Sequence, residues 1–398
     1  MEKYKKYKNS GIDWLLDEIP NHWETKRIKD LCKMQSGFYI SANDFQDEGF
    51  PIYGGNGFRG FSKDYNHNGE YTLIGRQGAL CGNVNYAKGK FWATEHAIVV
   101  YEKKRINKFW FGELLRLMNL NQYSLSAAQP GLSVEKIKRL KLPFIPKLKE
   151  QTEIANYLDA KTQTIDKKVK LLSEKISTYK DYRKTLINQT VTKGLDKNVK
   201  LKNSGINWIG EIPKHWEVKR IKDIFLISRG RAIGKTELKD KGLYPVYSSQ
   251  TKNKGVLGYI NTFDFNANLL TWTTDGVNAG TVFIREGKFN CTNICGTLIP
   301  NENPKLSLEY MAFAVQESTK HNKRIDTNGA KIMSNEMAVI NILVPPLKEQ
   351  QAIANYLDAK TQTIDTIIKN IENQITTLKE LRKTLINEVV TGNVKITE

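Results

Sequence analysis

Few side chains in this sequence are spaced as a catalytic or cofactor-binding group requires. Gly55 to Gly60 (GNGFRG) fits the dinucleotide pattern G-x-G-x-x-G, but no helix is predicted after it and no acidic residue follows at the required distance. His22 and His215 each precede a Trp in a repeated motif, so we interpret them as structural. Cys291 and Cys295 have no second Cys pair or His beside them, which favours buried thiols over a metal site. The sequence also lacks a phosphate-binding G-x-x-x-x-G-K-[ST] loop and a nuclease-like carboxylate cluster, so we predict a non-catalytic chain without cofactor or metal.

The charge of the chain indicates a polyanionic partner. The 398 residues include 61 Lys and Arg against 42 Asp and Glu, which gives a formal net charge of +19 and a pI near 9.5. Such an excess favours nucleic acid first, and an acidic membrane surface or acidic protein second. No apolar run approaches the roughly 20 residues that cross a bilayer, and the first residues lack the apolar region of a signal peptide. Four cysteines in a chain of this length indicate a reducing compartment, so we expect a cytoplasmic protein without membrane contact.

The side chains best suited to DNA contacts lie in two stretches of short β-favouring runs separated by Gly and Asn turns. The candidate contacts are Arg59, Lys63, Arg76 and Gln77 in the first stretch, and Arg229, Arg231, Lys235, Lys252, Lys254 and Thr274 in the second. Arg and Lys suit guanine edges or phosphates, and Gln suits adenine. Taken singly, each is more often a solvated surface residue or a phosphate contact than a base reader.

The elements that would position these residues occur twice. Ile154 to Asp166 (IANYLDAKTQTID) is identical to Ile353 to Asp365. The period is near half the chain, far too long for a solenoid unit, so the protein consists of two tandem copies of one module. Between the constant segments, residues 31–140 and 224–340 share only scattered landmarks. One frame with two different inserts suggests one scaffold that presents two different recognition surfaces.

Each module ends in a long predicted helix with one narrow apolar stripe. The first helix runs from Lys147 to about Val191 without Pro, and Gly194 lies just beyond it, where a helix stop is expected. The stripe residues alternate four and three positions apart, with Arg183 and Arg382 in the same register, and this is the heptad seam of a coiled coil. The seam consists of Ile165, Val169, Leu172, Ile176, Tyr179 and Leu186 in the first helix, and of Ile364, Ile368, Ile371, Ile375, Leu378 and Leu385 in the second. The alternative is a pair of core helices, each packed on its own domain, but the narrow stripe and its polar surroundings favour the coiled coil.

The short connection after the first helix predicts that the two helices pair antiparallel. A helix of about 45 residues is roughly 65 Å long at 1.5 Å per residue. Residues 192–200, which separate it from the second module, span at most about 30 Å. We therefore predict an α+β fold, in which two strand-rich globular domains are joined by two long helices that form an antiparallel coiled coil with a pseudo-two-fold internal repeat. The predicted globular domains are 1–146 and 193–345, and the predicted helical segments are 147–192 and 346–398.

Two short motifs occur at matching places in both modules. The openings are Ile19-Pro-Asn-His-Trp23 and Ile212-Pro-Lys-His-Trp216. The helix entrances, Pro146 to Leu158 and Pro346 to Leu357, share Leu-Lys-Glu-Gln followed by Ile-Ala-x-Tyr-Leu. This doubled arrangement, which spans the whole chain, resembles the specificity subunit of type I restriction-modification enzymes. One isolated helix entrance would be a weak signal, whereas the doubled pattern is specific.

The resemblance implies a subunit that binds DNA and catalyses nothing. Each globular part would be a target-recognition domain that reads one half of a split DNA sequence, and the coiled coil would set the spacer and dock the partners. The implied partners are double-stranded DNA, two modification subunits and the restriction subunits. S-adenosylmethionine, ATP and Mg²⁺ would belong to those partner subunits. Because inserts diverge within this family, the resemblance does not specify the target sequence.

Two alternatives belong to other functional classes. A self-contained methyltransferase would need a cofactor loop and an amino-methylation motif, and Val344-Pro-Pro-Leu347 lacks the Asp or Asn with which that motif begins. A coiled-coil adaptor for acidic proteins would explain the charge, but it would not explain two different inserts in one frame. A binding measurement distinguishes the adaptor from a DNA reader.

Overall fold

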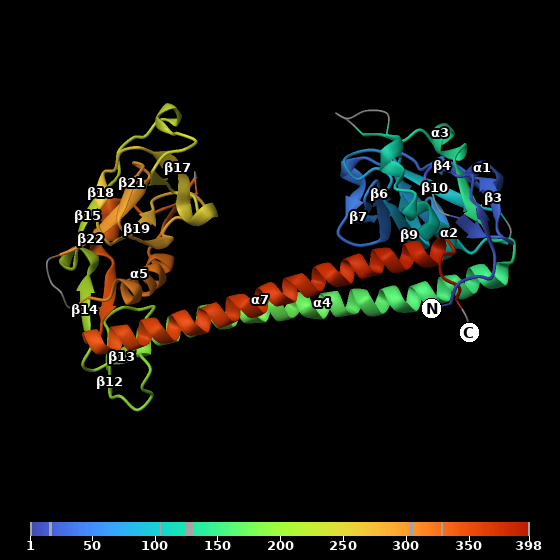
Figure 1. Cartoon of the computed structure of the whole chain (residues 1–398). Helices are drawn as coiled ribbons and strands as arrows, with labels where there is room; N and C mark the ends of the chain where they lie inside the picture. Colours follow the sequence, from blue (N-terminus) through green and yellow to red (C-terminus); the bar gives the residue numbers. More distant parts are fainter. Residues whose placement is uncertain are drawn as a thin grey trace. The chain divides into compact units, whose positions relative to one another are not determined.

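The computed structural model describes residues 2–15, 18–103, 105–124, 130–301, 306–327 and 329–396. The chain divides into two compact units, which we call unit 1 (Met1–Ser173 with Glu372–Glu398) and unit 2 (Glu174–Ile371). Two long helices, α4 (Leu148–Lys193) and α7 (Leu347–Val390), each contribute one part to either unit (Figure 1). The predicted boundaries instead separate globular parts from helices, and they stay a prediction.

Unit 1 contains a seven-stranded sheet with the strand order β4-β10-β8-β9-β6-β7-β5. Its strands are β1 (Tyr7–Asn9), β2 (Glu18–Pro20), β3 (Glu24–Arg27), β4 (Cys32–Ser36), β5 (Phe45–Gln46), β6 (Phe50–Gly54), β7 (Gly57–Ser62), β8 (His67–Gly75), β9 (Val84–Ala93), β10 (Ala97–Glu102) and β11 (Lys141–Phe144). Its shorter helices are α1 (Ile28–Leu31), η1 (Ala42–Asp44), α2 (Lys108–Leu117), η2 (Leu120–Tyr123) and α3 (Val134–Lys138). Within the sheet β6 and β9 run parallel, and the other neighbours run antiparallel. Trp110 and Phe111 of α2 are fully buried in one apolar cluster with Ile74 of β8, so this helix covers the sheet.

Unit 2 follows the order of the main elements of unit 1, with its sheet divided in two. The strand orders are β15-β22-β19-β20 and β17-β16-β21-β18. Its strands are β12 (Leu201–Asn203), β13 (Glu211–Pro213), β14 (Glu217–Arg220), β15 (Phe225–Arg229), β16 (Tyr244–Tyr247), β17 (Val256–Ile260), β18 (Phe265–Asn266), β19 (Leu269–Thr273), β20 (Val282–Arg285), β21 (Lys288–Cys291), β22 (Cys295–Pro300), β23 (Arg324–Asp326), β24 (Gly329–Lys331) and β25 (Asn341–Val344). Its shorter helices are η3 (Ile221–Asp223), η4 (Lys235–Glu237), η5 (Lys252–Gly255), α5 (Leu308–His321) and α6 (Ser334–Val339). The sheet divides because β18 with β19, and β20 with β21, replace the two long strands β8 and β9 of unit 1.

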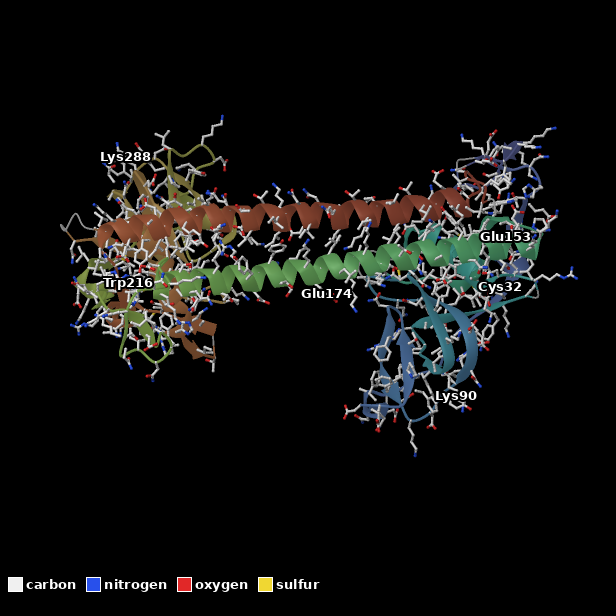
Figure 2. The ribbon with its side chains drawn as sticks, turned by 90° about the horizontal axis from the view of Figure 1, so that it is seen from below. Cys32, Lys90, Glu153, Glu174, Trp216 and Lys288 are labelled. Carbon is white, nitrogen blue, oxygen red and sulfur yellow. The ribbon has the colours of Figure 1, made fainter. Side chains whose placement is uncertain are left out.

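The repeated His-Trp and Glu residues hold each long helix at its start. In unit 1, Trp23 Nε1 donates to Glu150 Oε1 over 3.0 Å, and His22 Nε2 lies 3.0 Å from Glu150 Oε2. In unit 2, Trp216 Nε1 donates to Glu349 Oε2 over 2.9 Å (Trp216 is labelled in Figure 2). Both indole rings are fully buried, so each N–H needs the acceptor that the glutamate supplies.

The Gln of each helix entrance connects the long helix to the helix that covers the sheet. Gln151 Nε2 donates to the Ile145 carbonyl over 2.7 Å, while its Oε1 accepts from the Asn107 N–H over 2.8 Å, at the N-cap of α2. Gln350 does the same in unit 2, where its Oε1 accepts from the Ser307 N–H over 2.9 Å. The identical Glu and Gln of the two helix entrances are therefore explained by hydrogen bonds within each unit.

The two long helices pair antiparallel, as predicted. In unit 1, Arg382 Nε of α7 lies 3.1 Å from Asp166 Oδ1 of α4, and in unit 2 Arg183 Nε lies 3.2 Å from Asp365 Oδ1. Every residue of the predicted seam is buried or half-buried, and nearly all of the other positions between 166 and 185 are exposed. The fold class predicted from the sequence is thus confirmed.

The two ends of the chain meet within unit 1. The Lys395 N–H donates to the Glu2 carbonyl over 2.8 Å, and the Tyr7 hydroxyl donates to the Gly392 carbonyl over 3.1 Å. In unit 2 the corresponding connection is covalent, since residues after α4 continue directly into β12. The frame is therefore closed by hydrogen bonds in unit 1 and by the continuous chain in unit 2.

Candidate nucleic-acid interface

The loop between β8 and β9 (residues 76–82) has the same backbone path as the loop between β19 and β20 (residues 274–280). In each loop two glycines adopt φ values between 83° and 91°. The N–H of the last one, Gly82 or Gly280, donates over 2.8 Å to the carbonyl at the end of the preceding strand. A Cβ on Gly82 would lie 2.6 Å from a backbone nitrogen, so the close approach requires glycine there. The backbone is shared while the side chains on it differ, as different DNA contacts would require.

The structure brings together three of the predicted contacts of unit 1. Arg76 and Gln77 line one surface hollow with Ser36. Gln77 and Arg59 line a second hollow of about 560 Å³ with His96. Gln77 is exposed and lines both hollows, so it shares one hollow with each of the two arginines. The arrangement combines an amide that can hydrogen-bond to adenine with guanidinium groups that can bind guanine or phosphate.

Lys63 stands apart from this group. It is exposed just beyond the end of β7 and lines neither of the two hollows. A flexible, exposed lysine in that place suits a phosphate contact better than base discrimination.

A second pair of equivalent segments follows β4 and β15. A Cβ on Gly37 would lie 2.2 Å from a backbone oxygen, and one on Gly230 would lie 1.8 Å from another, so each segment is pressed against its sheet. The next two residues are Phe38 and Tyr39 in unit 1, which are 57% and 73% exposed. In unit 2 the corresponding residues are Arg231 and Ala232. Equivalent backbone positions therefore present aromatic rings in one unit and a guanidinium in the other.

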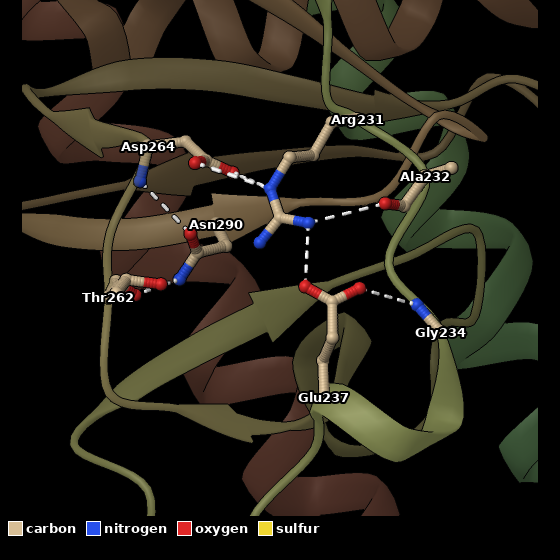
Figure 3. Close-up of polar contacts among 7 residues, drawn as sticks. All are labelled: Arg231, Ala232, Gly234, Glu237, Thr262, Asp264 and Asn290. Atoms are coloured by element: carbon tan, nitrogen blue, oxygen red, sulfur yellow. Dashed lines mark hydrogen bonds and ion pairs between the residues drawn. The ribbon is translucent and has the colours of Figure 1, made fainter.

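Arg231 is held by two carboxylates (Figure 3). Its Nη1 donates to Glu237 Oε2 over 2.7 Å, and its Nε lies 3.2 Å from Asp264 Oδ2. The Glu237 hydrogen bond raises the pKa of Arg231, and the same contact lowers the pKa of Glu237. Glu237 also accepts from the Gly234 N–H over 2.9 Å at the start of η4. The charge of Arg231 is thus compensated, so this side chain is better suited to shape the segment than to bind phosphate.

Five further predicted contacts lie in unit 2. Arg229 is half-buried, and its Nε donates to Ser334 Oγ over 2.8 Å. Lys235, Lys252 and Lys254 are exposed, and within the described part of the chain none of them is ion-paired. Thr274 requires a correction: its side chain is 3% exposed and its hydroxyl donates to the Ile294 carbonyl over 2.9 Å. Because that hydroxyl is buried and satisfied, we withdraw Thr274 as a direct DNA contact.

Sequence reasoning missed one lysine in each unit. Lys90 lies over the rings of Tyr65 and Phe50, with Nζ 4.7 and 5.7 Å from their centroids. Lys288 lies over Phe263 in the same way, at 4.7 Å (both lysines are labelled in Figure 2). Each lysine is exposed and precedes a buried Phe in the sequence. The repeated Lys-Phe dipeptide, 198 residues apart, is the signal that could have identified them.

The remaining chemical groups are consistent with a structural role. All four cysteines are buried and unpaired. Among the described residues there is no group of three or more His, Cys, Asp or Glu side chains that could hold a metal ion. Across the same residues, no helix has both the length and the apolar character that a membrane span requires.

Comparison with known proteins identifies related sequences. The family model of the type I restriction modification DNA specificity domain matches twice, over residues 20–175 and 213–377. The specificity subunit of the type I restriction enzyme EcoprrI of Escherichia coli is 44% identical over 163 residues, and the match covers 40% of this chain and 40% of that subunit. A protein named as a type I specificity subunit in Mycoplasma pneumoniae (strain ATCC 29342 / M129 / Subtype 1) is 35% identical over 64% of this chain and 86% of its own length.

Solved structures share the fold at low sequence identity. A chain from a structure described as the basis of complex assembly and conformational transition of the type I R-M system has a TM-score of 0.71 with 13% identity, covering 95% of this chain and 100% of that one. The HsdS subunit from Thermoanaerobacter tengcongensis has a TM-score of 0.54 with 13% identity, covering 95% of this chain and 99% of that subunit.

Proposed function

This chain belongs to the type I restriction-modification DNA specificity family, and on that premise we propose that each of its inserts reads one half of a bipartite DNA sequence. The observation that carries the proposal is the occurrence of different side chains at equivalent places on one backbone. Phe38 and Gln77 in unit 1 stand where unit 2 has Arg231 and Asp275. Differences of this kind on a common scaffold are what two different half-sites require.

Sequence-independent affinity would come from the positive charge of the chain. The net charge of +19 provides the attraction, and exposed lysines that form no ion pair with the described residues, such as Lys252 and Lys254, are suited to phosphate contacts. Of the predicted contacts we keep eight as DNA-facing: Arg59, Lys63, Arg76, Gln77, Arg229, Lys235, Lys252 and Lys254. Arg231 we assign to positioning, since its charge is compensated by two carboxylates.

The helical frame supports two copies of one protein partner. The 13 residues from Ile154 to Asp166 recur without change from Ile353 to Asp365, although several of them are exposed in both copies. Among the described residues, no hydrogen bond or ring contact constrains exposed side chains such as Asn156 and Asn355. Their identity therefore supports one docking surface used twice, by two modification subunits.

The chemistry would reside in those partners. Modification subunits would supply S-adenosylmethionine and flip an adenine out of the duplex in each half-site, and restriction subunits would supply ATP-dependent cleavage with Mg²⁺. Our chain would bind, orient and space the DNA, with globular domains at 1–146 and 193–345 and helical segments at 147–192 and 346–398. The complex would act in the cytoplasm, on the cell's DNA. No observation on this chain favours the adaptor for acidic proteins.

Methylation mapping tests the proposal. The chain is expressed with its modification subunit in cells without other adenine methylation, and methylated adenines are mapped across the genome. We expect two short half-sites separated by a spacer of constant length, and no methylation when either protein is missing. Methylation without a defined sequence, or the same sites in the absence of this chain, would contradict the proposal.

A further inference from the structure

Unit 2 contains a buried arginine that has no acidic partner among the described residues. Arg285, the last residue of β20, is 4% exposed. Its Nε donates to Thr271 Oγ1 over 3.0 Å, and its guanidinium lies 3.5 Å from the ring centroid of Tyr247. Its Nη2 is buried and has no hydrogen-bond partner in the part of the chain that the structure describes. Burial lowers the pKa of this group, which reflects how unfavourable a buried unpaired charge is.

The fold itself does not require an arginine at this place. In unit 1 the corresponding position of β9 is Ala87, which pairs with Tyr71 as Arg285 pairs with Leu269. Ala87 is also buried, and the strands around it continue without interruption. The charged side chain in unit 2 therefore needs an explanation other than sheet formation.

The explanation lies in the turn that the Arg285 guanidinium contacts. The turn η5 joins β16 to β17, and three consecutive residues in it are left-handed: Asn253 (φ 48°), Lys254 (φ 49°) and Gly255 (φ 86°). Residues other than glycine rarely adopt this conformation, and consecutive ones are rarer still, because Cβ crowds the backbone. Such a turn persists only where its surroundings hold it.

Arg285 is a buried side chain that contacts this turn, in addition to the Ser248 N–H, which donates to the Gly255 carbonyl over 3.0 Å. Its Nη1 donates to the Lys254 carbonyl over 2.8 Å, at the centre of the left-handed run. A Cβ on Gly255 would lie 2.8 Å from Arg285 Nη2, so the guanidinium packs directly against the turn. In unit 1 the matching hairpin between β6 and β7 is shorter and rich in glycine, so it needs no such support.

The supported turn presents a basic surface. Lys252, Asn253 and Lys254 are all exposed. The turn is also tied to the loop 274–280, since Asn278 Nδ2 donates to Thr251 Oγ1 over 3.0 Å. The lysines are thus fixed relative to the segment that corresponds to Gln77 of unit 1.

We propose that Arg285 is a positioning residue for DNA binding by unit 2, which fixes the left-handed turn so that Lys252 and Lys254 contact the phosphates of the second half-site. This inference rests on the proposed function of the chain as a DNA reader. Arg285 is buried, so it acts through the two lysines and has no contact of its own with DNA.

A double-mutant cycle on DNA affinity tests this role. The assembled complex with modification subunits is prepared as wild type, R285M, K252A/K254A and the triple variant, and binding to a duplex with the mapped target is measured by fluorescence anisotropy at several salt concentrations. We expect R285M and K252A/K254A each to weaken binding about tenfold. Each should also reduce the slope of log binding constant against log salt concentration (the salt slope) by one to two, since each lost phosphate contact removes about 0.9 from its magnitude. In the triple variant R285M should have no further effect, because the groups it positions are gone.

Matched variants separate positioning from a general loss of stability. Leu269→Ala removes a buried side chain from the strand that pairs with β20, and we expect it to lower the melting temperature with an unchanged salt slope. R285K keeps the charge with fewer donors, so it should give an intermediate affinity, and it replaces R285M in the cycle if that variant does not assemble. Equal weakening by R285M with and without the lysines, or an unchanged slope, would overturn the inference and leave the proposed function intact. A wild-type complex with no preference for its target over a scrambled duplex would overturn both.

Discussion

Units 1 and 2 have the same frame, yet the support beneath their exposed turns differs. In unit 1 the core under the sheet contains His67, stacked on Phe91 and bonded to the Tyr101 hydroxyl over 2.8 Å. In unit 2 the corresponding place holds Phe265, stacked on Phe289, beside the buried Arg285. The divergence of the inserts therefore extends into their cores. A recognition surface in this protein consists of its exposed side chains together with the buried groups that hold them.

Exchanging parts of the units is the strongest way to test this comparison. Replacing residues 31–140 with the whole insert of a relative should change one half of the methylated sequence completely and leave the other half as it was. Grafting only the turn 250–255 of unit 2 onto the β6–β7 hairpin should lower activity without transferring specificity, because Ala87 cannot hold the turn as Arg285 does. Methylation mapping reads both outcomes. If the insert exchange altered both halves, the units would not read DNA independently.

The helices that the units share should set the distance between their half-sites. Inserting seven residues between Leu172 and Ile176, and seven more between Ile371 and Ile375, keeps both seams in phase and adds about 10 Å to each helix. We expect the spacer to grow by at most about three base pairs, at roughly 3.4 Å each, with both half-sites unchanged. Three-residue insertions at the same places are the control, since they rotate the seam residues out of register. An unchanged spacer with full activity would show that the helices do not set the distance.

The glutamates of the two helix entrances, Glu150 and Glu349, should contribute differently to the stability of their units. Both glutamates contact the His and Trp of their unit, and Glu150 also accepts a hydrogen bond from the Tyr4 hydroxyl. Glu150→Ala leaves the buried Trp23 N–H and the half-buried Tyr4 hydroxyl without this acceptor and should destabilise unit 1 by about 2–3 kcal/mol. Glu349→Ala should cost unit 2 less, because this carboxylate is 42% exposed against 18% for Glu150. Hydrogen exchange of the two indole N–H groups measures each unit separately, and Glu→Gln variants serve as controls that keep an acceptor.

Only unit 1 should lose stability in mildly acidic solution through its buried histidine. Burial lowers the pKa of His67, so the unfolded chain takes up a proton at a higher pH than the folded one does. The contribution of neutral His67 to the free energy of unfolding is complete above the ordinary histidine pKa of about 6.5. It is lost as pH falls towards the lower pKa that His67 has in the folded protein, with a slope of at most about 1.4 kcal/mol per pH unit. His67→Phe copies Phe265 of unit 2 and should remove this dependence. Hydrogen exchange of β8 amides between pH 5 and 7.5 provides the measurement, and an unaltered pH dependence in the variant would contradict it.

The smallest effect is expected at the two ion pairs of the coiled coil. Arg183 pairs with Asp365 in unit 2, and Arg382 pairs with Asp166 in unit 1, with both carboxylates 59% exposed. Solvent screens such pairs, so alanine at either arginine should cost less than about 1 kcal/mol. The charge swap R183D/D365R should restore most of that loss at low salt and little at high salt. Equal costs at both salt concentrations would mean that the arginines act by packing alone.

The sequence by itself determined the frame of this protein. The duplicated motifs, the heptad spacing and the antiparallel pairing were all readable from the sequence. The duplicated motifs are constrained because half-buried glutamates and buried glutamines hydrogen-bond to specific partners in both units. Short strands were also predictable, since the two stretches of β-favouring runs separated by Gly and Asn turns contain the sheets of the two units. These features depend on local periodicity or on exact repetition, and both can be recognised in the sequence alone.

Only the tertiary structure decided the surroundings of each candidate contact. Arg231 meets Asp264 across 33 residues and Arg285 meets Lys254 across 31, because strands distant in the chain pair side by side. The same pairing buries the Thr274 side chain and places Gln77 between two hollows. Whether a charged side chain is free, compensated or buried depends on those neighbours. Residue type and spacing alone do not identify these spatial neighbours, since the two inserts that contain the neighbours share almost no sequence.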